Sequence, residues 1–213
     1  MADFKMSKFS DETFFIFSEL ADYVWKMREH LDHLIIKEKE ITLSGFSGSA
    51  LRLRQGIEEW KHNQLFPNAL HYSFIMLLFI TVEERLKKIC DLVQQKKNLP
   101  LRSKDLRGDS IEQGMIFLDK LAGISRDDIK HWPKITDLLK IRNCIVHTSG
   151  RIEFSRDKAY LKELIQKNPE YLKLSAHNPP EDKVLIVEHP YCMQSTKDAQ
   201  EFFEEICEKA GIE

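Results

Sequence analysis

The chain has 213 residues, of which 42% are apolar, 31% charged and 10% aromatic, so it can bury roughly 70% of its unfolded surface in one or two cores. Its 32 basic and 34 acidic residues give a formal charge of −2, which provides no whole-chain electrostatic reason to bind nucleic acid or membranes. With 8 glycines, 7 prolines and little apolar alternation, the sequence excludes collagen-like, low-complexity and β-sandwich proteins and predicts a mostly helical fold.

The sequence also predicts where the protein resides. The longest apolar run, Phe74–Ile80, is far shorter than the roughly 18 to 20 residues that span a bilayer, so we expect no transmembrane helix. The first residues lack the apolar stretch and cleavage site of a secretory signal, which favours a cytoplasmic location. Four cysteines lie far apart without a C-x-x-C pair, which predicts free buried thiols and neither a disulfide framework nor a zinc site.

Helical spacing of apolar residues dominates the first 150 positions. Glycine and serine predict a break at Ile41–Ser49, and a second break is predicted at Asn63–Pro67. The segment after Pro67 is apolar nearly all round at first, which indicates the central helix of a bundle. The predicted helices are Ser10 or Asp11 to about Glu40, Ala50–Lys61, Pro67 to about Lys96, Asp109 or Ser110 to about Leu121, and Pro133 to just before Gly150.

The pattern changes after Gly150, which we take as the boundary between a helical bundle (1–150) and a C-terminal extension (151–213) packed on it. The extension is predicted to be α+β: a helix over Arg156–Lys167, a short hairpin and a final acidic helix over Thr196–Ala210. The hairpin strands are Tyr171–Ser175 and Lys183–Glu188, on either side of Asn178-Pro179-Pro180. The predicted fold class is therefore mainly α, a helical bundle with a small C-terminal α+β extension.

The most informative residues lie at the end of the helix that precedes Gly150. Asn143 and His147 are four apart and share a helix face, whereas Arg142 and His147 diverge by about 140°. Arg142 falls near the middle of the apolar arc, so we expect it to be largely buried and paired with an acid. The helix dipole favours a protonated His147, which makes acid or base chemistry possible. The alternative is structural: His147 caps the last carbonyls, and Arg142 pairs with an acid of the core.

The motif Arg142-Asn143-x-x-x-His147 resembles the Arg, four to six residues, His motif of the HEPN superfamily. The stretch around Glu83 looks like the acid-bearing part of that family's central helix, which implies Glu83 as the supporting acid for Arg142. The resemblance covers roughly Pro67–Gly150. It implies a helical bundle that forms a homodimer with two motifs facing one cleft, no cofactor and no metal.

Many members of that family are metal-independent endoribonucleases of toxin–antitoxin or anti-phage systems. The resemblance therefore implies RNA cleavage by attack of the 2′-OH on the adjacent phosphate. His147 would move protons, Arg142 would bind the phosphate, and Asn143 would support them. An antitoxin protein is then a possible partner. Other members keep the fold without catalysis, so the alternative is an inactive module that binds RNA or a protein partner.

One stretch of the chain is strongly basic. From Arg85 to Arg107 there are eight bases and two acids, a local net charge of +6. Phosphate attraction would suit RNA, although a solvated lysine-rich loop gives the same pattern. His30 and His33 share a helix turn, but no second ligand pair follows, so we expect no metal there. The predicted RNA-binding residues are Lys87, Lys88, Lys96, Lys97, Arg102, Lys104 and Arg107.

Overall fold

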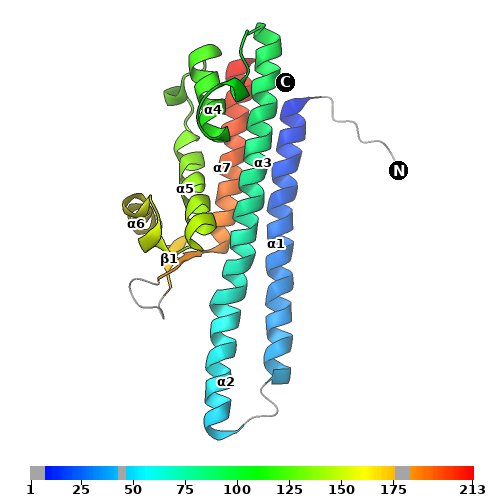
Figure 1. Ribbon diagram of the computed structural model, residues 1–213. Coiled ribbons are helices and arrows are strands. Elements are labelled where there is room, and N and C mark those ends of the chain that lie inside the picture. The colour runs from blue at the N-terminus through cyan, green and yellow to red at the C-terminus, as the bar shows by residue number, and fades with distance from the viewer. Residues whose placement is uncertain (1–7, 43–46, 176–182) are drawn as a thin grey trace, which may run out of the picture. The chain divides into compact units, whose positions relative to one another are not determined.

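The computed structural model describes residues 8–42, 47–175 and 183–213. Its described part is mainly helical, with one short antiparallel hairpin followed by a final helix (Figure 1), which confirms the predicted fold class. The predicted turn at Asn178-Pro179-Pro180 lies outside the described residues, as do positions 43–46 of the first predicted break. The α-helices are α1 (Phe9–Thr42), α2 (Gly48–Trp60), α3 (Phe66–Lys97), α4 (Ser110–Ile116), α5 (Trp132–Thr148), α6 (Lys158–Lys167) and α7 (His189–Ala210).

The predicted break at Asn63–Pro67 is wrong. A π-helical turn, Lys61–Leu65, joins α2 to α3, and the Phe66 N–H bonds the carbonyl five residues back. Pro67 has no N–H for the carbonyl of Asn63, so a regular α-helix would leave that carbonyl unbonded. The wider π turn absorbs this defect, and the helix continues through the proline.

Among the described residues, one helix, Gly48–Lys97, is long enough and apolar enough to cross a membrane. The mean hydropathy of its most apolar window is 1.6. This is weak support for a membrane span, because the core helix of a soluble protein passes the same test. Phe74, Ile75 and Leu78 are fully buried against the rest of the chain, as expected for a core helix.

The chain divides into two compact units, and each contains residues from both sides of Gly150. The first unit comprises the chain up to Leu20, Leu77–Leu139 and Gln194–Glu213. Its aromatic core includes the stacked rings of Phe17 and Phe203, 5.7 Å apart.

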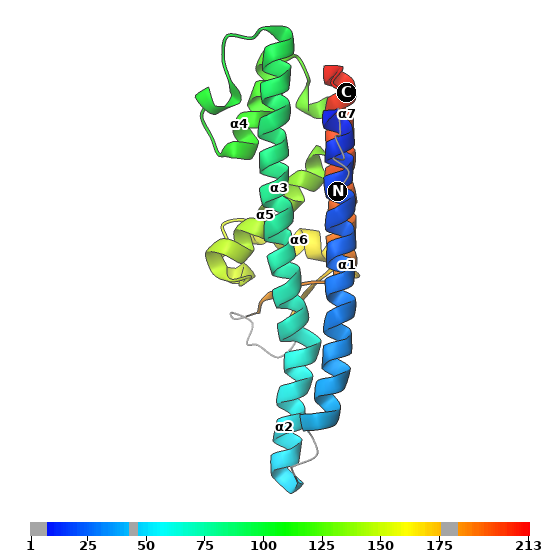
Figure 2. The same cartoon turned by 90° about the vertical axis from the view of Figure 1, so that its right-hand side faces the viewer.

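Helix α4 lies along the C-terminal half of α3 within the first unit (Figure 2). A side chain at Gly114 would come within 2.6 Å of Leu86, so only glycine permits this approach. Of the two caps that the sequence allows, Asp109 and Ser110, Asp109 caps α4 by accepting a hydrogen bond from the Glu112 N–H at 2.9 Å.

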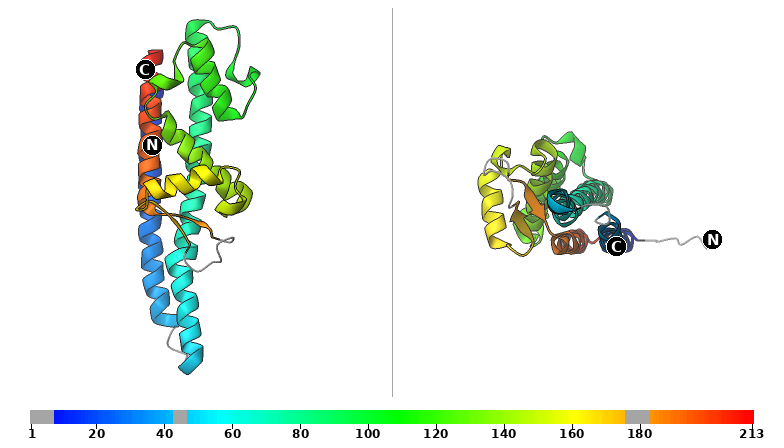
Figure 3. Two further views of the ribbon diagram at one scale, coloured as in Figure 1. Left: turned by 90° about the vertical axis from the view of Figure 1, so that its left-hand side faces the viewer. Right: turned by 90° about the horizontal axis from the view of Figure 1, so that it is seen from below.

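The second unit, Ala21–Met76 and Lys140–Met193, holds the hairpin of β1 (Leu172–Leu174) and β2 (Leu185–Val187). The strands pair antiparallel with Leu172 opposite Val187. Side chains from the start of α3 fasten β2: Tyr72 Oη donates to the Leu185 carbonyl at 2.5 Å, and His71 Nδ1 bonds the Val187 carbonyl at 2.6 Å. Helix α6 runs beside the hairpin (Figure 3), so the end of α5, the hairpin and α6 form one local framework.

Candidate functional site

Helix α5 ends in a left-handed turn that brings the following loop back to the helix. Ser149 and Gly150 have φ angles of 53° and 79°, and the Gly150 N–H caps the carbonyl of Cys144 at 3.2 Å. An ion pair of 2.8 Å between Lys140 and Asp157 then fixes the returning loop against α5. Both residues of the pair are less than one-third exposed, so the loop is held firmly.

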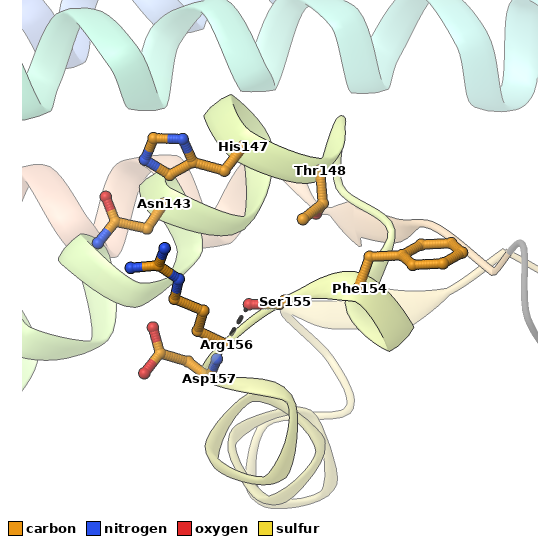
Figure 4. A pocket seen from close by; sticks show the side chains of 7 residues that line it. All are labelled: Asn143, His147, Thr148, Phe154, Ser155, Arg156 and Asp157. Atoms are coloured by element: carbon orange, nitrogen blue, oxygen red, sulfur yellow. Dashed lines mark hydrogen bonds between the residues drawn. The ribbon is translucent and has the colours of Figure 1, made fainter.

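Between this loop and the end of α5 lies a pocket of about 380 Å³. Asn143 and His147 come from α5, and the side chain of Arg156 extends toward them from the loop (Figure 4). The spacing of four residues predicts that Asn143 and His147 share a face, and the pocket contains both. His147 is exposed, so a ligand can reach its ring from solvent. The pocket is lined by Asn143, His147, Thr148, Phe154, Ser155, Arg156 and Asp157.

Arg142 differs from its predicted environment: it is half-buried, not largely buried. The buried positions of α5 are Ile135, Leu138, Ile141 and Cys144, spaced by three residues. This spacing moves the buried face around the helix by about 60° at each step, so Arg142 lies at its margin near the C-terminus.

The guanidinium of Arg142 is not part of the pocket wall. Its Nη1 donates a hydrogen bond of 2.9 Å to Oδ1 of Asn143. The amide NH₂ of Asn143 is thereby left as the donor available on the pocket side. Arg142 therefore acts on the pocket through Asn143.

The supporting acid proposed by the resemblance, Glu83, belongs to the first unit, whereas Arg142 belongs to the second. Within its own unit, Glu83 accepts a hydrogen bond from the Ser110 hydroxyl. Its pairing with Arg142 stays a prediction.

The arginine that is buried and paired with an acid is not Arg142, as predicted, but Arg85, which is only 1% exposed. Its Nη2 donates to Glu12 at 3.0 Å and to Thr13 at 2.8 Å, and its guanidinium lies 4.3 Å from the centre of the Phe9 ring. In the sequence, Arg85 stands out only as part of the basic stretch. Its partners come from a segment more than 70 residues away, which no local pattern reveals.

The other bases of that stretch have different environments, all within the first unit. Lys88 pairs with Glu12 at 2.6 Å, Lys96 donates to the carbonyl of Ala210 at 3.3 Å, and Lys97 donates to the carbonyl of Ala122 at 2.5 Å. These three lysines therefore hold together segments that are distant in the sequence. The exposed bases for which the described part of the chain offers no ion pair are Lys87, Arg102, Lys104 and Arg107.

The residue pattern places Arg156 at the start of a predicted helix and gives no sign that it reaches a pocket. Helix α6 begins two residues later, at Lys158, so Arg156 belongs to the loop and reaches the pocket. It is exposed and forms no ion pair within the described ranges. The neighbouring Asp157 is engaged by Lys140, so the positive charge of Arg156 is left for an anionic ligand.

The cysteine nearest to this site along the chain is Cys144, whose side chain is buried. Burial raises the pKa of the Cys144 thiol, and the side chain lies 3.5 Å from the Thr148 hydroxyl. A thiol that stays protonated is a poor nucleophile. The pocket thus offers an imidazole, an amide and a guanidinium: groups that transfer protons and bind anions.

Among the described residues, two groups of side chains outside the pocket could hold a metal ion, because in each the ligand atoms lie within 4.8 Å of one another. In the group of Glu38, Glu58 and His62, Glu58 is paired with Arg54 at 2.7 Å. Lys61 lies within 3.5 Å of the carboxylates of Glu38 and Glu58, so protein cations already balance their charge. Neither group includes a residue of the pocket. The groups are Glu38, Glu58 and His62, and His131, Asp198 and Glu201.

We compared the chain with protein-family models, with curated proteins and with solved structures, and found no match among any of them.

Proposed function

We propose that the protein is a metal-independent endoribonuclease whose active site is the pocket of Asn143, His147 and Arg156. The observation that carries this proposal is that an exposed histidine and two donor side chains share one pocket of about 380 Å³. The motif from Arg142 to His147, which resembles that of the HEPN superfamily, supports the same chemistry.

The reaction needs no nucleophile from the protein. The 2′-OH of a ribose attacks the adjacent phosphorus as its proton passes to His147, and the bond to the 5′-oxygen of the next nucleotide breaks. The products are a 2′,3′-cyclic phosphate and a 5′-hydroxyl. The NH₂ group of Asn143 donates to the charged phosphate in the transition state, and Arg142 positions that amide by its hydrogen bond of 2.9 Å to Oδ1.

The leaving 5′-oxygen also needs a proton, and a single histidine does not serve as base and acid within one step. A homodimer that brings together two copies of His147 resolves this difficulty, with one imidazole removing a proton while the other donates one. We therefore extend the proposal to a homodimeric, cytoplasmic enzyme that acts on RNA in a toxin–antitoxin or anti-phage system. Its regulator would be an antitoxin protein.

One observation favours a second candidate, an inactive module that binds RNA or a protein partner. The guanidinium of Arg142 does not line the pocket, so it cannot touch a phosphate there without a rotamer change. A binding module needs only the exposed donors, whereas catalysis needs His147 to transfer protons.

The test is incubation of the purified protein with total RNA in excess EDTA, followed by denaturing electrophoresis. Wild type is expected to fragment the RNA, and His147→Ala is expected to be inactive. The matched control is His30→Ala, because His30 is an exposed helical histidine outside the pocket. RNA left intact by all three folded proteins would contradict the enzyme and favour the binding module.

A further inference from the structure

One face of helix α7 carries three carboxylates beside a histidine of the first unit. Asp198, Glu201 and Glu205 are three and four positions apart, so their side chains leave the helix on the same side. His131 belongs to the turn before α5. Its Nε2 lies 2.8 Å from Oε2 of Glu201, and its Nδ1 lies 2.8 Å from Oε1 of Glu205. None of the four residues is exposed, which distinguishes them from the solvated acids common on helix surfaces.

Neighbouring contacts hold His131 against α7. The ring of Trp132 lies 6.3 Å from the ring of Phe202, which is fully buried on α7. Glu205 also accepts a hydrogen bond of 3.4 Å from the backbone N–H of His131. The imidazole and the carboxylates are therefore brought together by packing and by the backbone as well as by their mutual attraction.

The cluster of His131, Asp198, Glu201 and Glu205 carries more negative charge than the side chains around it balance. In the described part of the chain, the lysine that pairs with it is Lys197, 3.7 Å from Oε1 of Glu201. The side chain of Lys197 is 66% exposed, so this ion pair contributes little. The group of Glu38, Glu58 and His62 differs, because Arg54 and Lys61 already bind its two carboxylates. An excess of carboxylates around an imidazole favours a cation as the ligand.

We infer that His131, Asp198 and Glu201 bind one Zn²⁺ ion. Their ligand atoms lie within 4.8 Å of one another. Rotation of the side chains brings such atoms to the separation of about 3.3 Å that bonds of about 2.0 to 2.1 Å require in a tetrahedral site. Ca²⁺ and Mg²⁺ take oxygen ligands, whereas an imidazole nitrogen together with carboxylates suits Zn²⁺.

Glu205 is the outer partner of this site. A metal-binding histidine usually donates its other ring N–H to a carboxylate, and Nδ1 of His131 has that partner at 2.8 Å. This contact leaves the lone pair of Nε2 for the metal. Zn²⁺ takes the place of the proton between Nε2 and Glu201, and that proton is released to solvent. The ion joins the turn before α5 to α7, and three protein ligands leave a fourth position for water.

The zinc site includes no residue of the pocket at the end of α5. The inference therefore does not rest on the proposed ribonuclease, whose chemistry uses no metal ion. Cleavage of RNA in EDTA tests the ribonuclease, and binding of Zn²⁺ tests this site, so the failure of one is distinguishable from the failure of the other.

The test uses the untagged full chain, treated with EDTA, dialysed and titrated with ZnCl₂ by isothermal titration calorimetry. Wild type is expected to bind one Zn²⁺ per chain, and its Tm is expected to rise by about 5 to 10 °C when free Zn²⁺ is about 100 times the Kd. Asp198→Asn removes a ligand that forms no ion pair with His131 in the described structure, and it is expected to weaken binding at least about tenfold. Glu205→Gln is expected to weaken binding about 10- to 100-fold.

The matched control is Glu208→Gln, because Glu208 is an exposed acid of α7 outside the cluster. The Tm of each protein is measured before zinc is added, and Asp198→Asn is expected to match wild type. The inference is supported if Asp198→Asn and Glu205→Gln lose affinity for Zn²⁺ and Glu208→Gln does not. It is overturned if wild type binds no Zn²⁺, or if Asp198→Asn binds it as tightly as wild type; the cluster is then an ion-paired histidine and nothing more.

Discussion

The ion pair between Glu12 and Arg85 makes a quantitative prediction about stability. Arg85 is 1% exposed, and its Nη2 lies 3.0 Å from the Glu12 carboxylate and 2.8 Å from the Thr13 hydroxyl. Glu12→Gln keeps the shape of the side chain but removes the nearer of two carboxylates that pair with the buried arginine; the other, Glu84, lies 3.9 Å from Nη1 and is 60% exposed. The folded state must then hold a guanidinium with weaker acceptors.

Breaking a fully buried pair costs about 3 to 5 kcal/mol. The Glu12 side chain is 39% exposed, so water partly replaces the lost carboxylate, and Thr13 remains as an acceptor. A hydrogen bond to a charged group contributes about 1.5 to 3 kcal/mol. We therefore expect Glu12→Gln to lower the free energy of unfolding by about 2 kcal/mol, which is within the range for a hydrogen bond to a charged group and below the range for a fully buried pair.

The assay is urea unfolding followed by circular dichroism. Glu19→Gln is the control, because Glu19 is an exposed residue of the same helix, and its effect is expected within about 0.5 kcal/mol of wild type. Equal stability of Glu12→Gln and Glu19→Gln would refute the reasoning.

The pH dependence of this difference gives an independent check. Hydrogen bonds from Arg85 and Lys88 hold the pKa of Glu12 below its ordinary value of 4.5. The stabilisation is therefore fully present above pH 4.5 and is lost as the pH falls through the lower pKa of the folded state. The gap between wild type and Glu12→Gln should close at acid pH. A gap that persists there would show that the charge is not its source.

Three further predictions follow from the second unit and from the turn after α4. Gly150→Ala places a Cβ against the Tyr72 hydroxyl, whereas the Cβ of Gly123→Ala, which is also at positive φ, meets open space. In urea unfolding, Gly150→Ala should therefore lower the free energy of unfolding by about 1 to 3 kcal/mol more than Gly123→Ala does. Burial lowers the pKa of His71 to about 4, whereas the same histidine in the unfolded chain binds a proton below about pH 6.5. The free energy of unfolding of wild type should therefore fall by about 3 kcal/mol between pH 6.5 and 4, and that of His71→Asn should not show this loss. Parallel pH profiles for the two proteins would refute this. Arg142→Ala should lower kcat for RNA by up to about a hundredfold with KM nearly unchanged, whereas a change in KM alone would show that Arg142 only binds substrate.

The sequence was sufficient for most of the fold because its signals are local. The helical spacing of apolar residues, the cap at Asp109 and the glycine after α5 act within a few positions, and each identifies an element that the structure contains. The break predicted at Pro67 failed for a different reason. A proline usually ends a helix, and the π turn that permits it here leaves no signature in the residue pattern.

The site could be predicted only where its residues lie on one helix. The spacing of Asn143 and His147 brings both to the pocket, as expected for positions four apart. Arg156 enters from a loop whose return depends on the turn at Gly150 and on the ion pair to Lys140. The buried arginine was predicted at position 142 and found at position 85, because burial depends on packing between distant segments, not on the apolar arc of one helix.

Mass spectrometry of the ends produced from a single-stranded RNA in EDTA decides whether the 2′-OH is the nucleophile. We expect 2′,3′-cyclic phosphates and 5′-hydroxyls with wild type, and no cleavage at a linkage whose 2′-OH is replaced by hydrogen. Ends that carry 3′-hydroxyls and 5′-phosphates, or cleavage that proceeds at the 2′-deoxy position, would contradict attack by the 2′-OH and the role assigned to His147.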